Sequence, residues 1–228
     1  MPPVKTLKKP LGHCRLYGFV DMSYLKQRDP LQAMRQMIAG GVNVVQLRDK
    51  RGDVRATLDL ARQLRELADD AGTWFIVNDS PWIARQCCAD GVHLGQEDLQ
   101  ITSVTAAKDI LGASAVIGVS THSLEQALDA ERRGAGYIAV GPVFATATKP
   151  DVKPVGLDLV TEVTMRVRTP VFAIGGINRG NAGQVIRAGA RAVAVVSDIL
   201  CAEDVTNATL ELKKMLDIGA RRPHSFAQ

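Results

Sequence analysis

The chain has 228 residues, of which 46% are hydrophobic and 23% charged, a composition ordinary for a globular protein of one domain. Five of its 28 basic residues lie in the terminal segments (Lys5, Lys8, Lys9, Arg221, Arg222), and the other 23 nearly balance 24 acidic residues, which argues against a nucleic-acid surface. No apolar run approaches the roughly 20 residues of a bilayer span, and none follows the N-terminus as in a signal peptide. We therefore expect a cytoplasmic protein without nucleic-acid or membrane partners.

Eight short apolar runs rich in β-branched residues alternate with longer amphipathic segments. Runs of such continuous apolar character are typical of parallel strands covered on both faces. The predicted strands are Leu16–Val20, Val42–Leu47, Trp74–Val77, Gly91–Leu94, Val116–Val119, Tyr137–Val140, Val171–Ile174 and Ala192–Val196.

The segments between these runs carry helix start and stop signals. Residues 53–70 place apolar side chains three or four positions apart, with Asp53 as a capping residue and Gly72 as a left-handed stop. Ser123–Arg133 and Asn181–Ala188 follow the same pattern. Each of them is followed by a glycine before the next strand, which predicts a turn repeated around a ring.

This alternation predicts an α/β fold, a single-domain (β/α)₈ barrel of the TIM type over residues 15–218, with tails at residues 1–14 and 219–228. A doubly wound open sheet is the alternative. Such a sheet usually has fewer strands and a glycine-rich loop after the first one. Here Asp21-Met22-Ser23-Tyr24 follows the first strand, so the barrel is favoured.

In a barrel, chemistry is expected at the carboxyl ends of the strands, and the ends of the last two strands commonly bind a phosphate. Gly175 and Gly176 end the seventh strand and Ser197 the eighth. Glycines let the backbone approach an anion closely, and the serine adds a hydroxyl donor. The alternative is a tight turn without a ligand.

Two aspartates end neighbouring strands and are candidates for holding a cation. Asp79 and Asp98 follow the third and fourth strands, and Mg²⁺ often takes one or two carboxylates, water and substrate phosphate. Helix capping is the alternative role for both. Arg48, Lys50 and Lys149 supply positive charge at the same rim, unless they are solvated loop residues. This set suggests two phosphorylated ligands, one of them a magnesium-bound polyphosphate.

Seven runs resemble those of the thiamine-phosphate synthase family and occur in its order. They are VQLRDK, VND, DGVHLGQEDL, GVSTH, GPVFATATK, AIGGI and VVSDI, over about residues 15–200. The resemblance implies an aminopyrimidine diphosphate held by Gln46, Leu47, Arg48, Asp49, Lys50, Asn78, Ser120 and Lys149. It also implies a thiazole phosphate lined by Thr146, Ala147, Thr148, Gly176, Val196 and Ser197.

The same resemblance implies Mg²⁺ on Asp79 and Asp98, with Ser120 and Lys149 as catalytic residues. The implied reaction is loss of pyrophosphate from the pyrimidine methylene and attack by the thiazole nitrogen on the resulting cation. Three positions depart from the family: Asp49 stands for glutamate, Ala145 for proline and Asp198 for alanine. An extra carboxylate beside a phosphate site is unfavourable, so Asp198 is the most significant departure.

Two other functions stay open at this point. A thiazole tautomerase would use a histidine for proton transfer, and His122 follows the fifth strand, whereas His93 within the fourth is expected to be structural. A barrel that binds a ligand without catalysis would not need Asp79, Asp98 and Lys149 together. A homo-oligomer is possible, and the sequence does not fix the number of subunits.

Overall fold

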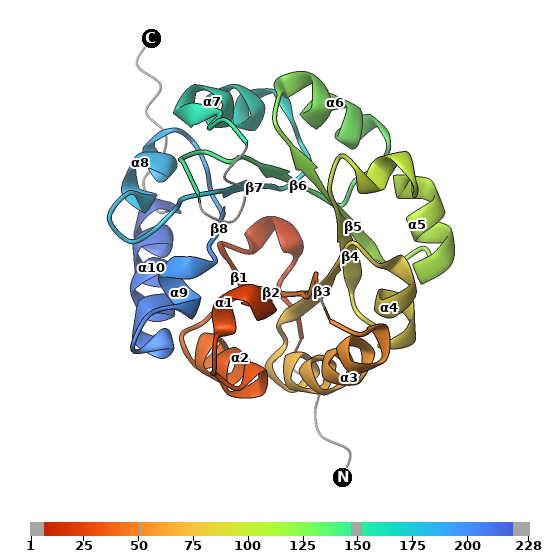
Figure 1. The fold of residues 1–228 in the computed structure, drawn as a ribbon. Helices are drawn as coiled ribbons and strands as arrows, with labels where there is room; N and C mark the ends of the chain where they lie inside the picture. Colours follow the sequence, from red (N-terminus) through yellow and green to blue (C-terminus); the bar gives the residue numbers. More distant parts are fainter. Residues whose placement is uncertain (1–6, 51, 147–151, 221–228) are drawn as a thin grey trace.

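The computed structural model describes residues 7–50, 52–146 and 152–220, in which eight parallel strands close into one barrel (Figure 1). Each strand pairs with the next along the chain, and the last pairs with the first. The strands are β1 (Leu16–Asp21), β2 (Val44–Arg48), β3 (Trp74–Asn78), β4 (Gly91–Leu94), β5 (Val116–Thr121), β6 (Tyr137–Val140), β7 (Val171–Ile174) and β8 (Val193–Ala194). The predicted TIM-type barrel is confirmed.

Helices surround this barrel as an outer ring (Figure 1). The main ones are α2 (Pro30–Ala39), α3 (Val54–Ala71), α4 (Pro81–Gln86), α5 (Val104–Leu111), α6 (Leu124–Arg132), α7 (Gly156–Arg166), α8 (Ala182–Arg187) and α10 (Val205–Ala220). Short helices α1 (Met22–Leu25) and α9 (Ser197–Leu200) follow β1 and β8, and 3₁₀ turns lie at η1 (Leu11–His13) and η2 (Asp98–Gln100). In the described part of the chain, no helix is both long and apolar enough to span a membrane.

Asp53 and Ser123 act as the predicted helix caps, whereas Asn181 makes no side-chain cap bond at the start of α8. Asp53 caps α3 by accepting hydrogen bonds from the backbone N–H groups of Arg55 and Ala56, and Gly72 ends the helix with φ 65°. Ser123 caps α6 through the N–H of Gln126. These local interactions satisfy donors that the first turn of a helix leaves unpaired, which is why the sequence shows them.

Two strands are shorter than predicted. β2 begins at Val44 rather than Val42, because the side chain of Asn43 accepts hydrogen bonds from the backbone N–H groups of Arg15 and Leu16. β8 ends at Ala194 rather than Val196, because Val196 already has helical backbone angles and leads into α9. At the carboxyl end of β8 the chain therefore leaves the strand earlier than the apolar run indicates.

The barrel interior is filled by an aromatic layer distinct from the aliphatic core under the helices. Tyr17, Tyr137 and Phe172 pack edge to face, with ring centroids 5.4 to 5.8 Å apart. Gly118 makes room for this layer, since a Cβ atom there would lie 2.0 Å from the ring of Tyr137. Tyr17 and Phe172 of this layer form the floor of the open space above it.

The segment before β1 packs against the amino ends of the strands. Lys8 Nζ lies 2.5 Å from a carboxylate oxygen of Asp90, and the indole N–H of Trp74 donates to the carbonyl of Lys9. Cys14 is 1% exposed. The prediction that residues 1–14 are a tail therefore needs correction for residues 8–14, because these contacts join them to the opposite end from the polar rim.

Candidate active site

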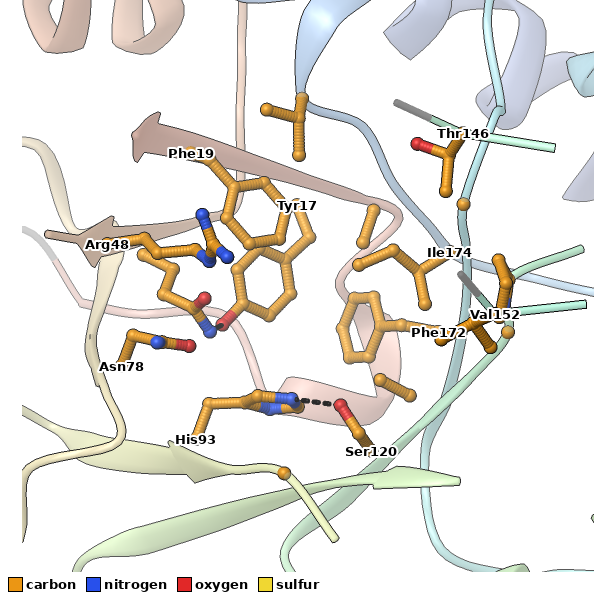
Figure 2. A pocket seen from close by; sticks show the side chains of 18 of the residues that line it. Tyr17, Phe19, Arg48, Asn78, His93, Ser120, Thr146, Val152, Phe172 and Ile174 are labelled. Atoms are coloured by element: carbon orange, nitrogen blue, oxygen red, sulfur yellow. Dashed lines mark hydrogen bonds between the residues drawn. The ribbon is translucent and has the colours of Figure 1, made fainter. Parts of the chain in front are cut away.

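A cavity of about 650 Å³ opens at the carboxyl ends of the strands. Figure 2 shows side chains from several strands converging on it, with Arg48, Asn78, His93 and Ser120 around a floor that contains Tyr17 and Phe172. Successive side chains of a strand alternate between its two faces, so the inward positions of each strand point here. Polar groups far apart in the sequence thereby share one space.

The floor of the cavity holds a continuous chain of buried hydrogen bonds. The amide nitrogen of Gln46 lies 2.8 Å from the hydroxyl of Tyr17, which lies 2.9 Å from that of Tyr137. His93 continues the chain, with Nδ1 2.9 Å from the Tyr137 hydroxyl and Nε2 2.8 Å from Ser120 Oγ. His93 is only 8% exposed and fully engaged, as expected for a structural histidine, yet it lines the cavity.

Arg48 is held at the cavity wall by a partner that the sequence analysis missed. Its Nη1 lies 2.7 Å from a carboxylate oxygen of Asp21, and Asp21 is completely buried. The other oxygen of Asp21 accepts from the backbone N–H of Ser23 and caps α1. An arginine paired in this way keeps further guanidinium donors for an anion in the cavity.

Two residues predicted to touch the pyrimidine do not line the cavity. Leu47 is 1% exposed and packs in the core under the helices, because it alternates with the inward residues Gln46 and Arg48. Asp49 turns away and accepts hydrogen bonds from the backbone N–H of Gly52 and the hydroxyl of Thr57. The shortened acid at position 49 therefore orders the loop after β2.

Asp79 and Asp98 meet at the rim, as predicted. Burial first, and then the negative charge of Asp98, raise the pKa of the Asp79 carboxyl, while Lys50 at 3.4 Å opposes the shift. Asp79 has φ 62°, which is uncommon for a residue other than glycine. Capping does not explain it, because Ser80 caps α4 instead. Two adjacent carboxylates in a half-buried place suit a shared cation.

The Oδ2 atom of Asp98 also accepts a hydrogen bond from the backbone N–H of Gly95, at 2.7 Å. This contact fixes the loop after β4 with the carboxylate on the cavity wall. Within residues 7–50, 52–146 and 152–220, no three His, Cys, Asp or Glu side chains cluster as a complete metal cage. Two protein ligands are what Mg²⁺ commonly uses beside substrate phosphate and water.

The other side of the cavity holds residues that the sequence analysis predicted to bind a phosphate. Gly176, Val196, Ser197 and Thr146 all line it. Gly175 and Gly176 have φ 99° and 64°, and added Cβ atoms would lie 2.4 Å from Pro142 and 2.5 Å from the carbonyl of Ala145. Both glycines thus allow the loop after β6 to pack closely, and they would also allow an anion to approach the backbone. The short helix α9 starts at Ser197, an arrangement typical of phosphate sites in barrels.

Asp198 has a local basic partner that the sequence analysis did not anticipate. Its carboxylate accepts from the backbone N–H of Arg179 at 2.9 Å and from Arg179 Nε at 3.1 Å. Arg179 also pairs with Glu211 on α10 at 2.9 Å. The charge of Asp198 is therefore balanced locally, and it fastens the loop after β7 to α9.

Three predicted site residues, Ala147, Thr148 and Lys149, lie outside the described residues. His122 lines the cavity, and its Nδ1 contacts the carbonyl of Gly141. The sequence analysis did not assign Asp21, Tyr17, Tyr137 and Phe172 to the site. The sequence pattern that could have identified them is the alternation along β1, β6 and β7. This alternation places every second side chain inside the barrel.

The fold and the cavity define a (β/α)₈-barrel enzyme whose site lies at the carboxyl ends of its strands. The sequence model described as thiamine monophosphate synthase matches residues 16–199. Thiamine-phosphate synthase of Shouchella clausii is 46% identical over 199 residues, 87% of this chain and 94% of that protein. Thiamine-phosphate synthase of Methanocella arvoryzae is 48% identical over 202 residues, 88% of this chain and 94% of that protein.

A solved structure agrees with these relatives. Thiamine phosphate pyrophosphorylase from Pyrococcus furiosus superimposes with a TM-score of 0.84 at 34% identity, covering 92% of this chain and 99% of that one. The chain belongs to the thiamine monophosphate synthase family, whose named members are transferases. The family resemblance stated from the seven sequence runs is confirmed.

Proposed function

We propose that this chain is a thiamine-phosphate synthase that joins an aminopyrimidine methyl diphosphate to a thiazole phosphate and releases pyrophosphate. The observation that carries the proposal is one cavity with two differently built ends. Asp79, Asp98 and Lys50 stand at one end, and Gly176 and Ser197 at the other. A diphosphate with a cation suits the first end, and a monophosphate suits the second.

The residues present fit a magnesium ion at Asp79 and Asp98. Both are hard oxygen ligands, and the raised pKa of Asp79 shows that the carboxylate lacks sufficient compensating charge by itself. When bound, Mg²⁺ would supply charge neutralisation for the departing pyrophosphate. In the described residues no third His, Cys, Asp or Glu side chain completes a metal-holding cluster with these two, so substrate oxygens and water would complete the coordination.

The protein's own groups would hold the two substrates in line. Arg48, fixed by Asp21, and Lys50 would bind the diphosphate, while Asn78 on β3 and Ser120 on β5, which both line the cavity, would contact the pyrimidine. The bond between the pyrimidine methylene and the diphosphate oxygen breaks, and the oxygen keeps the electron pair. The thiazole nitrogen then forms the new bond to the methylene carbon, so the reaction depends on alignment and charge more than on proton transfer.

The test is a product assay with the purified protein, both substrates and Mg²⁺. Thiamine phosphate and pyrophosphate should appear in equal amounts, and excess chelator should abolish turnover. Asp98→Ala should lower kcat/KM at least 10²-fold, a loss of about 3 kcal/mol of transition-state stabilisation. Asp109→Ala on α5, remote from the cavity lining, is the matched control and should leave turnover unchanged.

Other outcomes would contradict parts of this proposal. Full activity in excess chelator would overturn the assignment of Asp79 and Asp98. Isomerisation of a thiazole without condensation would favour the tautomerase alternative, with His122 as the group to mutate next. Binding of both ligands without product would favour a non-catalytic barrel.

A further inference from the structure

The chain of hydrogen bonds in the cavity floor links five side chains from five different strands. It runs from Gln46 on β2 through Tyr17 on β1, Tyr137 on β6 and His93 on β4 to Ser120 on β5, with each contact 2.8 to 2.9 Å long. Only its two ends, the amide and the serine, belong to the substrate contacts implied by the family resemblance. The three central groups have no role in the reaction proposed above.

One direction through this chain follows if Gln46 is its first donor and each hydroxyl passes its hydrogen to the next group. Gln46 donates an amide hydrogen to Tyr17, so the single hydroxyl hydrogen of Tyr17 is available for Tyr137. In that direction Tyr137 donates to Nδ1 of His93, 2.9 Å away. Burial raises the pKa of both phenols far above the ordinary value, so each keeps its one hydrogen.

The same direction continues through the imidazole. With Nδ1 accepting, a neutral His93 carries its hydrogen on Nε2 and donates it to Ser120 Oγ, 2.8 Å away. The Ser120 oxygen then accepts a hydrogen bond from His93. The hydroxyl hydrogen of Ser120 can therefore point into the cavity that Ser120 lines.

We propose that Tyr17, Tyr137 and His93 are positioning residues that transmit the donor direction of Gln46 across the barrel and make Ser120 a hydrogen-bond donor to the substrate. The complementary ligand has an unprotonated ring nitrogen beside an exocyclic amino group, as an aminopyrimidine does. This inference rests on the proposed function, and it specifies how the pyrimidine is recognised. An analogue with an oxo group in place of the amino group carries a hydrogen on that ring nitrogen and would oppose the serine hydroxyl.

The first experiment measures the direction of the chain without any substrate. The protein is labelled with ¹⁵N at its four histidines, and the His93 signals are assigned by comparison with His93→Asn. Near neutral pH, Nδ1 of His93 should be an unprotonated acceptor and Nε2 should carry the hydrogen. A hydrogen on Nδ1, or on both nitrogens, would overturn the proposal.

The second experiment breaks the chain and measures substrate discrimination. Tyr137→Phe removes the donor to His93 and keeps the ring that packs on Gly118. A site built around a substrate hydrogen bond can discriminate by about 10⁴-fold. The preference of kcat/KM for the aminopyrimidine diphosphate over its oxo analogue should fall at least about tenfold in this variant. The KM for the thiazole phosphate should stay within about twofold, because the chain should affect only pyrimidine recognition.

Two further variants separate direction from packing. Thr121→Val also removes a buried hydroxyl from the barrel wall, one that donates to the carbonyl of Ala139 outside the chain, and should keep the wild-type preference. Tyr17→Phe keeps the contact between Tyr137 and His93 but removes its fixed donor. Both neutral forms of His93 should then appear in the ¹⁵N spectrum, whereas an unchanged spectrum would contradict the proposal.

The design distinguishes this inference from the function on which it rests. A wild-type protein that makes no product from either pyrimidine would contradict the proposed function, while the nitrogen spectrum would still decide the direction of the chain. A protein that makes thiamine phosphate and has unchanged preference in Tyr137→Phe would keep the function and overturn the positioning role.

Discussion

Asp79 combines two unfavourable features, a left-handed backbone and a poorly solvated carboxylate. Its φ is 62°, a region that aspartate and asparagine tolerate better than most residues. Burial and the neighbouring charge of Asp98 raise its pKa. A residue retained in such a place is better explained by a ligand than by its contribution to folding.

Asp79→Asn should therefore stabilise the metal-free protein. A carboxyl whose folded pKa lies above its unfolded pKa is destabilising when ionised, so the penalty is present above the folded pKa and disappears as pH falls below the unfolded one. The unfolding temperature in chelator should be higher for the variant at neutral pH, and the difference should shrink towards acid pH. A lower unfolding temperature at neutral pH would contradict this account of Asp79.

Lys149, outside the described residues, remains a prediction from the resemblance, which makes it a charge on the leaving diphosphate. Such a lysine stays protonated across physiological pH. Lys149→Ala should lower turnover at least 10²-fold, and Lys149→Arg should restore part of it, since the charge is kept. The pH–rate profiles of both variants and the wild type check this. An ionisation near neutrality that is lost in Lys149→Arg, without recovery of activity, would indicate a general base instead.

At the scale of elements, the site depends on how the loops after β7 and β8 are fastened together. Arg179 and Asp198 join them through one backbone and two side-chain hydrogen bonds, and Gly175 and Gly176 let the loop after β6 approach. None of these links is local in sequence. The geometry of the proposed phosphate site therefore depends on contacts between three βα units.

Asp198→Ala introduces the residue that the family usually has, and the structure predicts a loss rather than an improvement. The backbone N–H of Arg179 loses its acceptor, at a cost of about 1 kcal/mol after allowance for solvent screening. The KM for the thiazole phosphate should rise severalfold as the loop loosens, with the pyrimidine KM unchanged. Glu211→Gln removes only the negative charge of the outer, exposed partner of Arg179 and is the control. A lower KM for the thiazole phosphate in Asp198→Ala would instead show that the negative charge of Asp198 weakens phosphate binding.

At the scale of the whole molecule, the barrel has a catalytic end and a closed end. Lys8, Asp90 and Trp74 tie the N-terminal segment to the amino ends of the strands, and Arg65 also pairs with Asp90 at 2.8 Å. In barrels of this type, residues at the amino ends of the strands contribute to stability, and residues at the carboxyl ends carry the chemistry. The two ends should therefore respond differently to truncation.

A chain that starts at Leu7 should match the full-length protein in unfolding temperature and turnover. One that starts at Arg15 should lose about 2 kcal/mol, because Asp90 loses Lys8 and the Trp74 indole loses its acceptor. This corresponds to a fall of roughly 4 to 8 °C in unfolding temperature, with kcat unchanged. The sequence analysis placed residues 1–14 in a tail outside the barrel. Equal unfolding temperatures for the two chains would show that the segment contributes nothing, and a fall in kcat would contradict the separation of the ends.

Much of the fold could be predicted from the sequence, because the residues that start and end its helices act on near neighbours in the chain. Asp53, Gly72 and Ser123 satisfy or end a helix within four residues of themselves, and continuous apolar runs identify buried parallel strands. The ends of β2 and β8 were less predictable, since Asn43 acts on a neighbouring strand and α9 begins early.

The sequence by itself determined the order of strands and helices, the family, and that Asp79, Asp98, Gly176 and Ser197 follow strand ends. Only the tertiary structure decided which way each side chain points and what it meets. It turned Leu47 and Asp49 away from the cavity, paired Asp198 with Arg179, and joined Tyr17, Tyr137 and His93 across the barrel. The physical reason is that helix caps and apolar runs act through neighbours along the chain. A hydrogen bond across a closed barrel joins residues more than 100 positions apart, and only the closure of the sheet brings them together.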